Sequence, residues 1–372
     1  MNIDFLDGNE MTALGAFEAG CNFFAGYPIT PASAILQQMI DDLPKHGGIA
    51  VQAEDEIASI GFCLGASMTG KKVLTATSGP GLSLYSENIG LAIMGETPIV
   101  IVDVQRHSPA TGSATKDGAS DIQFARWSTS GGYPIIALVP TTAEECYTLT
   151  MLAFNYAEQY RTPVFVLSSK EIAMTRTRID WSKIKKPEII NRTYHKPSDG
   201  PYIPYRFAKS EDIPPFMAYG GEEITRYTTS THDETANLLS DPEKIQRMMD
   251  HLNKKIDSDK ISHVVKDFEE GAETLIVSYG VASRTAMEAI KTARANNIKV
   301  SSLIIHSVWP VPEMEIKNAL KNIKRVIVPE MNPGQYIFEV QRMIGDNVEL
   351  VGVNTMDTRL INPEKIYQAI VK

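Results

Sequence analysis

Short, nearly continuous apolar runs alternate with amphipathic segments through the first half of the chain. The runs are CNFFAG (21–26), KVLTATS (72–78), PIVIVDVQ (98–105), PIIALVP (134–140) and PVFVLSS (163–169). Strands of a parallel sheet that is covered by helices on both faces have this pattern, because both of their faces are buried. We therefore predict an α/β domain over residues 1–180.

Two of the intervening segments begin with helix-start signals. Thr142 and Glu145 form the pattern of a capping box before the segment 146–160, which is rich in apolar residues. Thr30 followed by Pro31 matches an N-cap and a first-turn proline before another amphipathic run. We predict that a helix starts at each of these positions.

The pattern breaks over residues 181–270, where prolines, tyrosines and charged residues show neither the helical nor the strand period. We interpret this region as a linker or excursion with one helix, over 241–256, whose apolar residues share a face. The alternation resumes with TLIVSYG (274–280), KVSSLIIH (299–306) and RVIVPEMN (325–332), and a last helix starts at Pro363. A second, smaller α/β domain is predicted over 271–372.

Composition and charge narrow the functional classes. A chain of 372 residues fits two domains of ordinary size, and 43% hydrophobic and 22% charged residues are typical of a globular protein. The net charge of −9 and the lack of basic clusters disfavour a nucleic-acid partner. The acidic start and the absence of a long apolar run predict a cytoplasmic protein with no membrane association. The three cysteines lack the close spacing of metal-binding pairs, so no metal is expected on this chain.

Residues that could bind a ligand or take part in catalysis follow three of the predicted strands. Ligands of open α/β sheets bind beyond the carboxyl ends of the strands. The residues in that position are Tyr27–Thr30, Ser78–Gly81 and Arg106–Ser108, so we expect them to lie along one edge. TSGPG at 77–81 fits an anion-binding loop and fits a tight strand-to-helix turn equally well, because it lacks the P-loop lysine.

Charged side chains in these stretches leave alternatives open. Arg106 could hold a carboxylate in a bidentate fork, or it could form a salt bridge with Asp103 or Asp121. Three acids open the segment QAEDEIASIGFCLGASMTG, where they could complement a helix N-terminus or include a functional carboxylate. The isolated His107, His232 and His306 are expected to be solvated or core side chains, and THDE at 231–234 suits a ligand loop or a surface turn.

Several motifs in register extend over nearly the whole chain. They are AGYPITPAS, QAEDEIASIG, TATSGPGLSL, ETPIVIVDVQR, TPVFVLSS, THDE, PVPEMEI and EMNPGQ. In this order they resemble the alpha subunit of 2-oxoacid:ferredoxin oxidoreductases, most closely the 2-oxoglutarate branch.

The resemblance implies an architecture and an assembly. The first domain would be the pyrimidine-binding domain of a thiamine diphosphate enzyme, and the last would resemble the transketolase C-terminal domain. A separate beta subunit would hold the diphosphate end with Mg²⁺ and an iron–sulfur cluster. The first domain begins near residue 8, so a gamma subunit would be a further separate chain. Coenzyme A would be the co-substrate and ferredoxin the electron acceptor.

The resemblance also implies roles for individual residues. The family's catalytic carboxylate hydrogen-bonds N1′ of the aminopyrimidine. Counting back from Gly65 and Gly70, which match the family's helix glycines, places it at Glu56, with Glu54 as the second choice and Asp55 as the third.

Other positions match the family's binding sites. Thr30 and Arg106 would face the 1-carboxylate of the substrate. The residues expected at the cofactor are Tyr27, Pro28, Ser78 and Gly79. Candidates for a substrate or coenzyme A loop are His107, Lys116, Thr231 and His232. His107 stands where many relatives have glycine, which leaves the identity of the 2-oxoacid open.

The favoured hypothesis is an enzyme subunit that oxidatively decarboxylates 2-oxoglutarate to succinyl-CoA. Branched-chain 2-oxoacids or pyruvate are the alternative substrates. A non-catalytic α/β binding or assembly protein is disfavoured by the retained acid, Thr30 and Arg106. A self-contained transketolase-like enzyme is disfavoured because the sequence has no GDG-type motif for metal and diphosphate.

Overall fold

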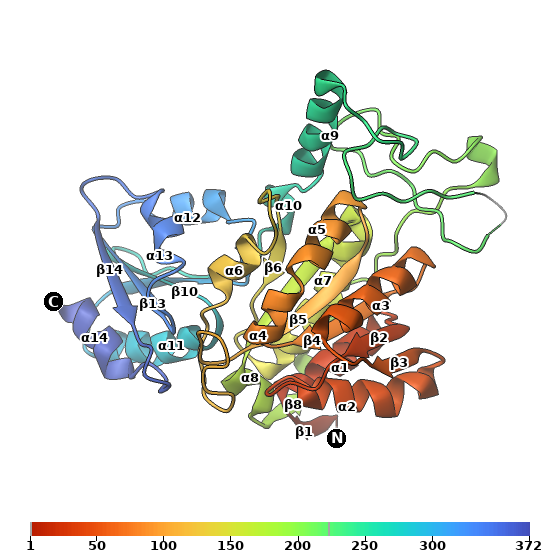
Figure 1. Ribbon diagram of the computed structural model, residues 1–372. Helices are drawn as coiled ribbons and strands as arrows, with labels where there is room; N and C mark the ends of the chain where they lie inside the picture. The colour runs from red at the N-terminus through yellow and green to blue at the C-terminus, as the bar shows by residue number, and fades with distance from the viewer. Residues whose placement is uncertain (1, 222–223) are drawn as a thin grey trace.

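A computed structural model describes residues 2–221 and 224–372 of the chain (Figure 1). Its larger sheet has seven strands in the order β12-β6-β7-β5-β4-β2-β3, parallel except for the antiparallel pair β12 and β6. The strands are β2 (Phe23–Gly26), β3 (Ile49–Gln52), β4 (Val73–Thr77), β5 (Ile99–Gln105), β6 (Ile136–Leu138), β7 (Pro163–Ser169) and β12 (Ser307–Trp309). The five predicted runs are therefore neighbouring strands of one sheet.

Helices cover both faces of this sheet, as predicted. One face carries α1 (Gly8–Glu18), α2 (Ser33–Asp42) and α7 (Ala143–Tyr160), and the other carries α3 (Glu56–Met68) and α5 (Ser86–Met94). Val100 and Val102 of β5 pack in the first core, whereas Ile99 and Ile101 pack in the second. Successive side chains of a strand point to opposite faces, so a continuous apolar run serves both cores.

The two predicted helix starts have different outcomes. The Thr142 hydroxyl accepts a hydrogen bond from the Glu145 amide, and the Glu145 carboxylate accepts one from the Thr142 amide. The capping box of α7 is therefore confirmed. The predicted cap at Thr30 is wrong, because α2 begins at Ser33 after Ala32, which makes no side-chain cap. Residues 30–32 form a turn instead, and the Thr30 carbonyl accepts a hydrogen bond from Arg106.

A second sheet of five strands lies toward the C-terminus in the order β14-β13-β10-β11-β9. These strands are β9 (Val264–Asp267), β10 (Thr274–Ser278), β11 (Val300–Ile305), β13 (Arg325–Glu330) and β14 (Glu349–Asn354). Its helices are α11 (Gly280–Ala295), α12 (Glu313–Ala319), α13 (Ile337–Gln341) and α14 (Pro363–Val371). Strand β12 follows β11 directly and crosses to the larger sheet, so the two sheets are tied by backbone pairing.

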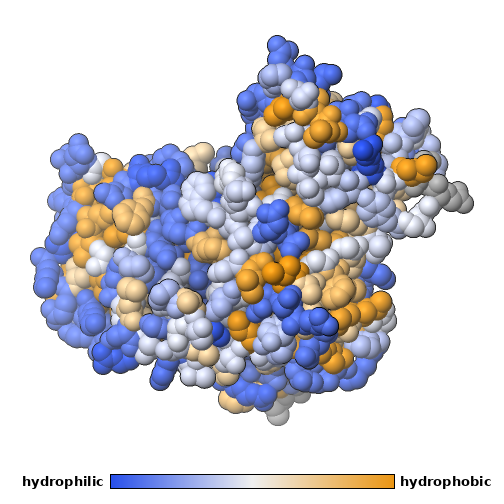
Figure 2. All heavy atoms as spheres, viewed as in Figure 1, coloured by the Kyte–Doolittle hydropathy of each residue, from blue (hydrophilic) through white to orange (hydrophobic). Residues whose placement is uncertain are grey.

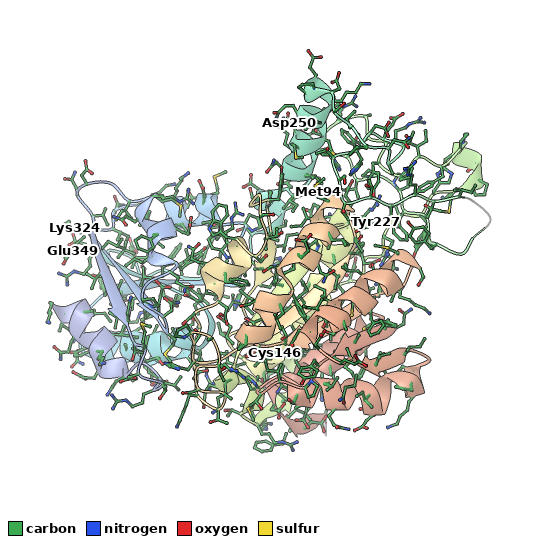
Figure 3. All side chains as sticks on the ribbon, viewed as in Figure 1. Met94, Cys146, Tyr227, Asp250, Lys324 and Glu349 are labelled. Atoms are coloured by element: carbon green, nitrogen blue, oxygen red, sulfur yellow. The ribbon has the colours of Figure 1, made fainter. Side chains whose placement is uncertain are left out.

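The excursion packs beside the amino ends of the large sheet (Figure 1). It contains the predicted helix as α9 (Pro242–Lys254), whose Met248 and Leu252 are buried. Figure 3 shows Tyr227 of the excursion beside Met94 at the end of α5, where the Tyr227 hydroxyl donates to the Leu91 carbonyl at 2.8 Å. A short α10 (Ser258–Ile261) leads on to β9.

A buried ion pair and a buried histidine contact hold the excursion in place. Lys255 and His251 both contact the Glu96 carboxylate at 3.1 Å, and all three side chains are buried. The cations beside Glu96 hold the pKa of this carboxyl well below its usual range, although burial opposes them. Across the described part of the chain no helix has the length and apolar character needed to cross a membrane.

Candidate functional site

Arg106 and Thr30 meet at the carboxyl edge of the large sheet. Arg106 follows β5, is 5% exposed, and donates from Nη1 to the Thr30 carbonyl at 2.7 Å and from Nη2 to the Thr111 carbonyl at 3.0 Å. The alternative of a salt bridge is not realised, since no ion pair joins Arg106 to Asp103 or Asp121 in the described structure. The Arg106 Nε has no protein partner.

The structure separates the three acids after β3. Asp55 is exposed and caps α3, accepting from the Ala58 amide at 2.7 Å. Glu54 is exposed as well, whereas Glu56 is 7% exposed and is the first residue of the helix. Since the other two acids face solvent or the helix end, Glu56 is the acid available for chemistry inside the protein.

Glu56 lies against the loop TSGPG. A Cβ atom placed on Gly81 would fall 2.7 Å from Glu56 Oε1 and 2.1 Å from Thr77 Oγ1. Real Cβ atoms do not approach other atoms so closely, so only glycine fits at this position beside the carboxylate. Within the described residues no side chain hydrogen-bonds the Glu56 carboxylate.

The rest of TSGPG turns sharply from β4 into the short helix α4 (Gly79–Leu84). Ser78 is fully buried, and its hydroxyl has no protein partner. The carboxylate of Asp121 lies 3.1 Å from where a Gly79 Cβ would be. Tyr27 and Pro28 after β2 are exposed and complete this edge.

Buried polar atoms without protein partners gather where β4, β5 and β7 end. They are Ser78 Oγ, Arg106 Nε, Asp117 Oδ2 and Ser169 Oγ. Asp103 and Asp121 lie beside them, and a proton on one of these two carboxyls makes a hydrogen bond to the other. Native proteins pair nearly all buried polar groups, so such a concentration is typical of a ligand site. Its position agrees with the rule that ligands bind beyond the carboxyl ends of parallel strands.

Two acids of this cluster influence each other. Burial raises the pKa of Asp103, and the neighbouring Asp121 raises it further, while Arg106 acts in the opposite direction. Burial raises the pKa of Asp121 to about 6. From the sequence, Asp103 and Asp121 are expected only as salt-bridge partners for Arg106. The signal that could have singled out Asp103 is a charged residue inside the apolar run PIVIVDVQ.

His107 and Lys116 belong to the loop that leaves β5. The His107 amide donates to the Lys116 carbonyl at 3.0 Å, and His107 Nε2 lies 3.2 Å from the Met356 carbonyl. Lys116 is exposed. His107 thus lies beside the proposed carboxylate site and contacts the C-terminal part of the chain.

Thr231 and His232 are not brought together with Arg106. The Thr231 hydroxyl donates to the Leu239 carbonyl at 3.1 Å, and His232 Nδ1 lies 2.8 Å from the Ser230 carbonyl. His232 lines a cavity of about 330 Å³ that also includes Glu96, a residue just before β5 begins. This places THDE at the amino edge of the sheet, opposite the carboxyl edge. Burial lowers the pKa of His232.

No group of three or more His, Cys, Asp or Glu side chains is arranged to hold a metal ion within residues 2–221 and 224–372.

The model of the family described as pyruvate flavodoxin/ferredoxin oxidoreductase, thiamine diphosphate-binding, matches residues 14–251. The model described as pyruvate:ferredoxin oxidoreductase core domain II matches residues 272–366.

Relatives match from end to end. The 2-oxoglutarate synthase subunit KorA of Methanothermobacter marburgensis is 40% identical over 99% of this chain and 98% of its own length. KorA of Methanocaldococcus jannaschii is 40% identical over 100% of this chain and 100% of its own length. The ketoisovalerate oxidoreductase subunit VorB of M. marburgensis is 31% identical over 100% of this chain and 97% of its own length.

Solved structures agree with these matches. A 2-oxoglutarate:ferredoxin oxidoreductase from Magnetococcus marinus, with 2-oxoglutarate, coenzyme A and succinyl-CoA bound, superposes with a TM-score of 0.92 at 33% identity. The match covers 100% of this chain and 65% of that one. A split-gene transketolase, at 12% identity and a TM-score of 0.57 over 99% of this chain and 98% of its own, shares the fold. The resemblance and the fold class drawn from the motifs are confirmed, and this chain belongs to the pyruvate flavodoxin/ferredoxin oxidoreductase family.

Proposed function

We propose that this chain is the alpha subunit of a 2-oxoglutarate:ferredoxin oxidoreductase. The complex would convert 2-oxoglutarate and coenzyme A to succinyl-CoA and carbon dioxide, and the two electrons released would pass to ferredoxin. Identity to the 2-oxoglutarate synthase subunits is 40%, against 31% for the ketoisovalerate subunit. The observation that carries the proposal is the placement of buried Glu56 and Arg106, with partly buried Thr30, along one edge of the sheet.

The residues around Glu56 fit the aminopyrimidine end of thiamine diphosphate. Gly81 has no side chain, which lets the Glu56 carboxylate lie directly against the loop, and Ser78 presents a buried hydroxyl without a protein partner. Tyr27, Pro28 and Gly79 flank the same edge. When bound, the cofactor supplies the nucleophilic carbon for attack on the 2-oxo group.

The protein residues would then have separate roles. The Glu56 carboxylate would accept a hydrogen bond from N1′ of the aminopyrimidine and hold the proton there. Arg106 would bind the 1-carboxylate of the substrate through its remaining N–H groups, with the Thr30 hydroxyl beside it. His107, at the end of the same strand, is the candidate to face the distal part of the 2-oxoacid.

A partner surface adjoins Glu56. On α3, Ile57 and Phe62 are 52% and 51% exposed, and a Cβ on Gly61 or Gly65 would meet no atom within 4 Å. Leu84 at the end of α4 is also exposed. Figure 2 shows hydrophobic atoms over these helices. We assign this face to a beta subunit that would carry the diphosphate site, Mg²⁺ and the iron–sulfur cluster, with gamma as a separate subunit.

The test is replacement of Glu56 by glutamine in the complex assembled with candidate beta and gamma subunits. Viologen reduction with 2-oxoglutarate and coenzyme A should fall by about 100-fold or more, because the amide cannot hold the N1′ proton as the carboxylate does. Glu54→Gln, at an exposed acid two residues earlier, should leave turnover unchanged. Unchanged turnover in the Glu56 variant would remove the catalytic assignment. Pyruvate and 2-ketoisovalerate, assayed in parallel, decide the substrate.

A further inference from the structure

The loop EMNPGQ (330–335) of the second sheet is bound to the segment 117–123 of the first. The Ala119 amide donates to the Met331 carbonyl at 3.1 Å, and Asn332 Nδ2 donates to the Ala119 carbonyl at 2.8 Å. Gln335 Nε2 donates to the Ser120 carbonyl at 2.6 Å. Residues more than 200 positions apart therefore share a continuous set of hydrogen bonds.

Gln123 completes this set from the other side. Its amide donates to Gln335 Oε1 at 3.1 Å, and its side-chain Nε2 donates to the Gln335 carbonyl at 2.9 Å. Both the Oε1 and the Nε2 atoms of Gln335 therefore hydrogen-bond to the segment 117–123. A glutamine that only solubilised the surface would not be held in this way.

The loop itself is held rigidly from within. The fully buried Glu330 carboxylate accepts from the amides of Gln335, Tyr336 and Ile337 at 2.8–3.1 Å, and from the Tyr279 hydroxyl at 2.6 Å. Asn332 Oδ1 accepts from the amides of Gly334 and Gln335. A buried carboxylate with several donors is a strong and directional anchor, so the donors that face 117–123 have fixed positions.

The segment 117–123 in turn contacts the carboxylate site. An ideal Cβ on Gly118 would lie 2.9 Å from the His107 Cα and 3.0 Å from the Arg106 carbonyl, so the two backbones are in direct contact. The Asp121 amide donates to Gln105 Oε1 at 3.1 Å. A shift of this segment would therefore move the backbone that carries Arg106.

We propose that Gln335 and Asn332 are positioning residues that hold the segment 117–123 against Arg106 and so set the position of its guanidinium. This inference rests on the proposed function, in which Arg106 binds the substrate carboxylate. In this role neither residue would touch substrate or cofactor. Their effect would be on the binding of the 2-oxoacid, because Glu56 is supported by a different loop.

The test uses Gln335→Met in the assembled complex, which removes both side-chain hydrogen bonds and keeps a similar volume. We expect the KM for 2-oxoglutarate to rise by about five- to tenfold, with kcat within about twofold of the wild type. Amide hydrogen exchange in 117–123 should be faster. Gln341→Met, the same change at an exposed residue of α13, should alter neither quantity. Gln123→Met, which removes a bond from the opposite side, should move KM in the same direction and replaces Gln335→Met if that variant does not fold.

The outcomes separate the two proposals. If the wild-type complex turns over no 2-oxoacid, the proposed function fails, and the positioning role is then tested by hydrogen exchange alone. Amide exchange in 117–123 that is unchanged by Gln335→Met would overturn the positioning role. In an active complex, an unchanged KM with a lower unfolding midpoint would also overturn it, because the loop would then only join the two sheets.

Discussion

Arg106→Lys tests the carboxylate site most directly, because it keeps the charge and removes the planar fork. Arg106 uses two of the guanidinium's five N–H groups on the carbonyls of Thr30 and Thr111. The groups that remain include the unpartnered Nε, so a bidentate contact to a carboxylate is still available. A lysine has three donors, and satisfying the same two carbonyls would leave one for the substrate.

The expected magnitude follows from this count. The lysine variant loses at least one of the two charge-assisted bonds to the carboxylate, which costs about 1.5–3 kcal/mol. That range corresponds to a fall of about 10- to 150-fold in kcat/KM. The 1-carboxylate is present in the ground state as well, so most of the fall should appear as a higher KM for the 2-oxoacid.

The assay is steady-state viologen reduction by the assembled complex with 2-oxoglutarate as the varied substrate. Arg126→Lys is the matched control, because Arg126 is partly buried and, like Arg106, donates to two backbone carbonyls, those of Gly132 and Tyr133, away from the carboxyl edge. Its kcat/KM should be unchanged. If Arg106→Lys folds normally and keeps kcat/KM within about twofold of the wild type, Arg106 does not bind the carboxylate.

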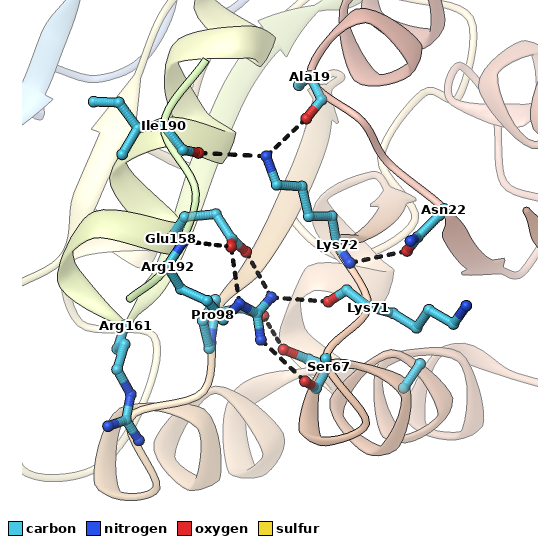
Figure 4. Close-up of polar contacts among 12 residues, drawn as sticks. Ala19, Asn22, Ser67, Lys71, Lys72, Pro98, Glu158, Arg161, Ile190 and Arg192 are labelled. Carbon is cyan, nitrogen blue, oxygen red and sulfur yellow. Dashed lines mark hydrogen bonds and ion pairs between the residues drawn. The ribbon is translucent and has the colours of Figure 1, made fainter. Parts of the chain in front are cut away.

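Two further predictions concern stability. Figure 4 shows the buried ion pair of Arg192 and Glu158, whose side chains approach to 2.6 Å and are 1% and 3% exposed. Glu158→Gln leaves the buried Arg192 charge without its partner and should lower the free energy of unfolding, measured by urea denaturation, by about 3–5 kcal/mol. Glu18→Gln, in an exposed pair with Lys186, should lower it by less than about 1 kcal/mol. Burial raises the pKa of Asp117 to about 6 from 3.8, so the folded state binds more protons than the unfolded state between these values, and the free energy of unfolding falls as pH rises through this window. Asp117→Asn should reduce this pH-dependent decrease in the free energy of unfolding by up to about 3 kcal/mol. If the variant and the wild type give parallel curves of stability against pH, Asp117 does not cause the decrease.

The central strands could be predicted from the sequence because they are buried on both faces. Edge strands could not, since β3 and β14 each have a neighbour on one side only and contain partly exposed residues. The three-residue β12 was missed for another reason. It is defined by its pairing with β6, a contact between distant parts of the chain that local periodicity does not record.

The sequence could name the edge where the site lies but could not orient its side chains. Asp55 and Glu56 are adjacent acids, and their different environments follow from where the helix begins: Asp55 stays extended as the N-cap, so Glu56 becomes the first helical residue and turns inward toward Gly81. The preference of aspartate for N-cap positions was an available signal for this choice.

Thr30 shows the same limit in the opposite direction. Its apparent capping pattern suggested that the hydroxyl serves the helix, yet α2 begins at Ser33, and it is the Thr30 carbonyl that contacts Arg106. The hydroxyl makes no hydrogen bond within the described residues, so it can face a substrate carboxylate without competing with a helix cap. The proline after it therefore belongs to the turn that presents Thr30 to Arg106, and the motif GYPITPAS is better explained by the site than by the helix.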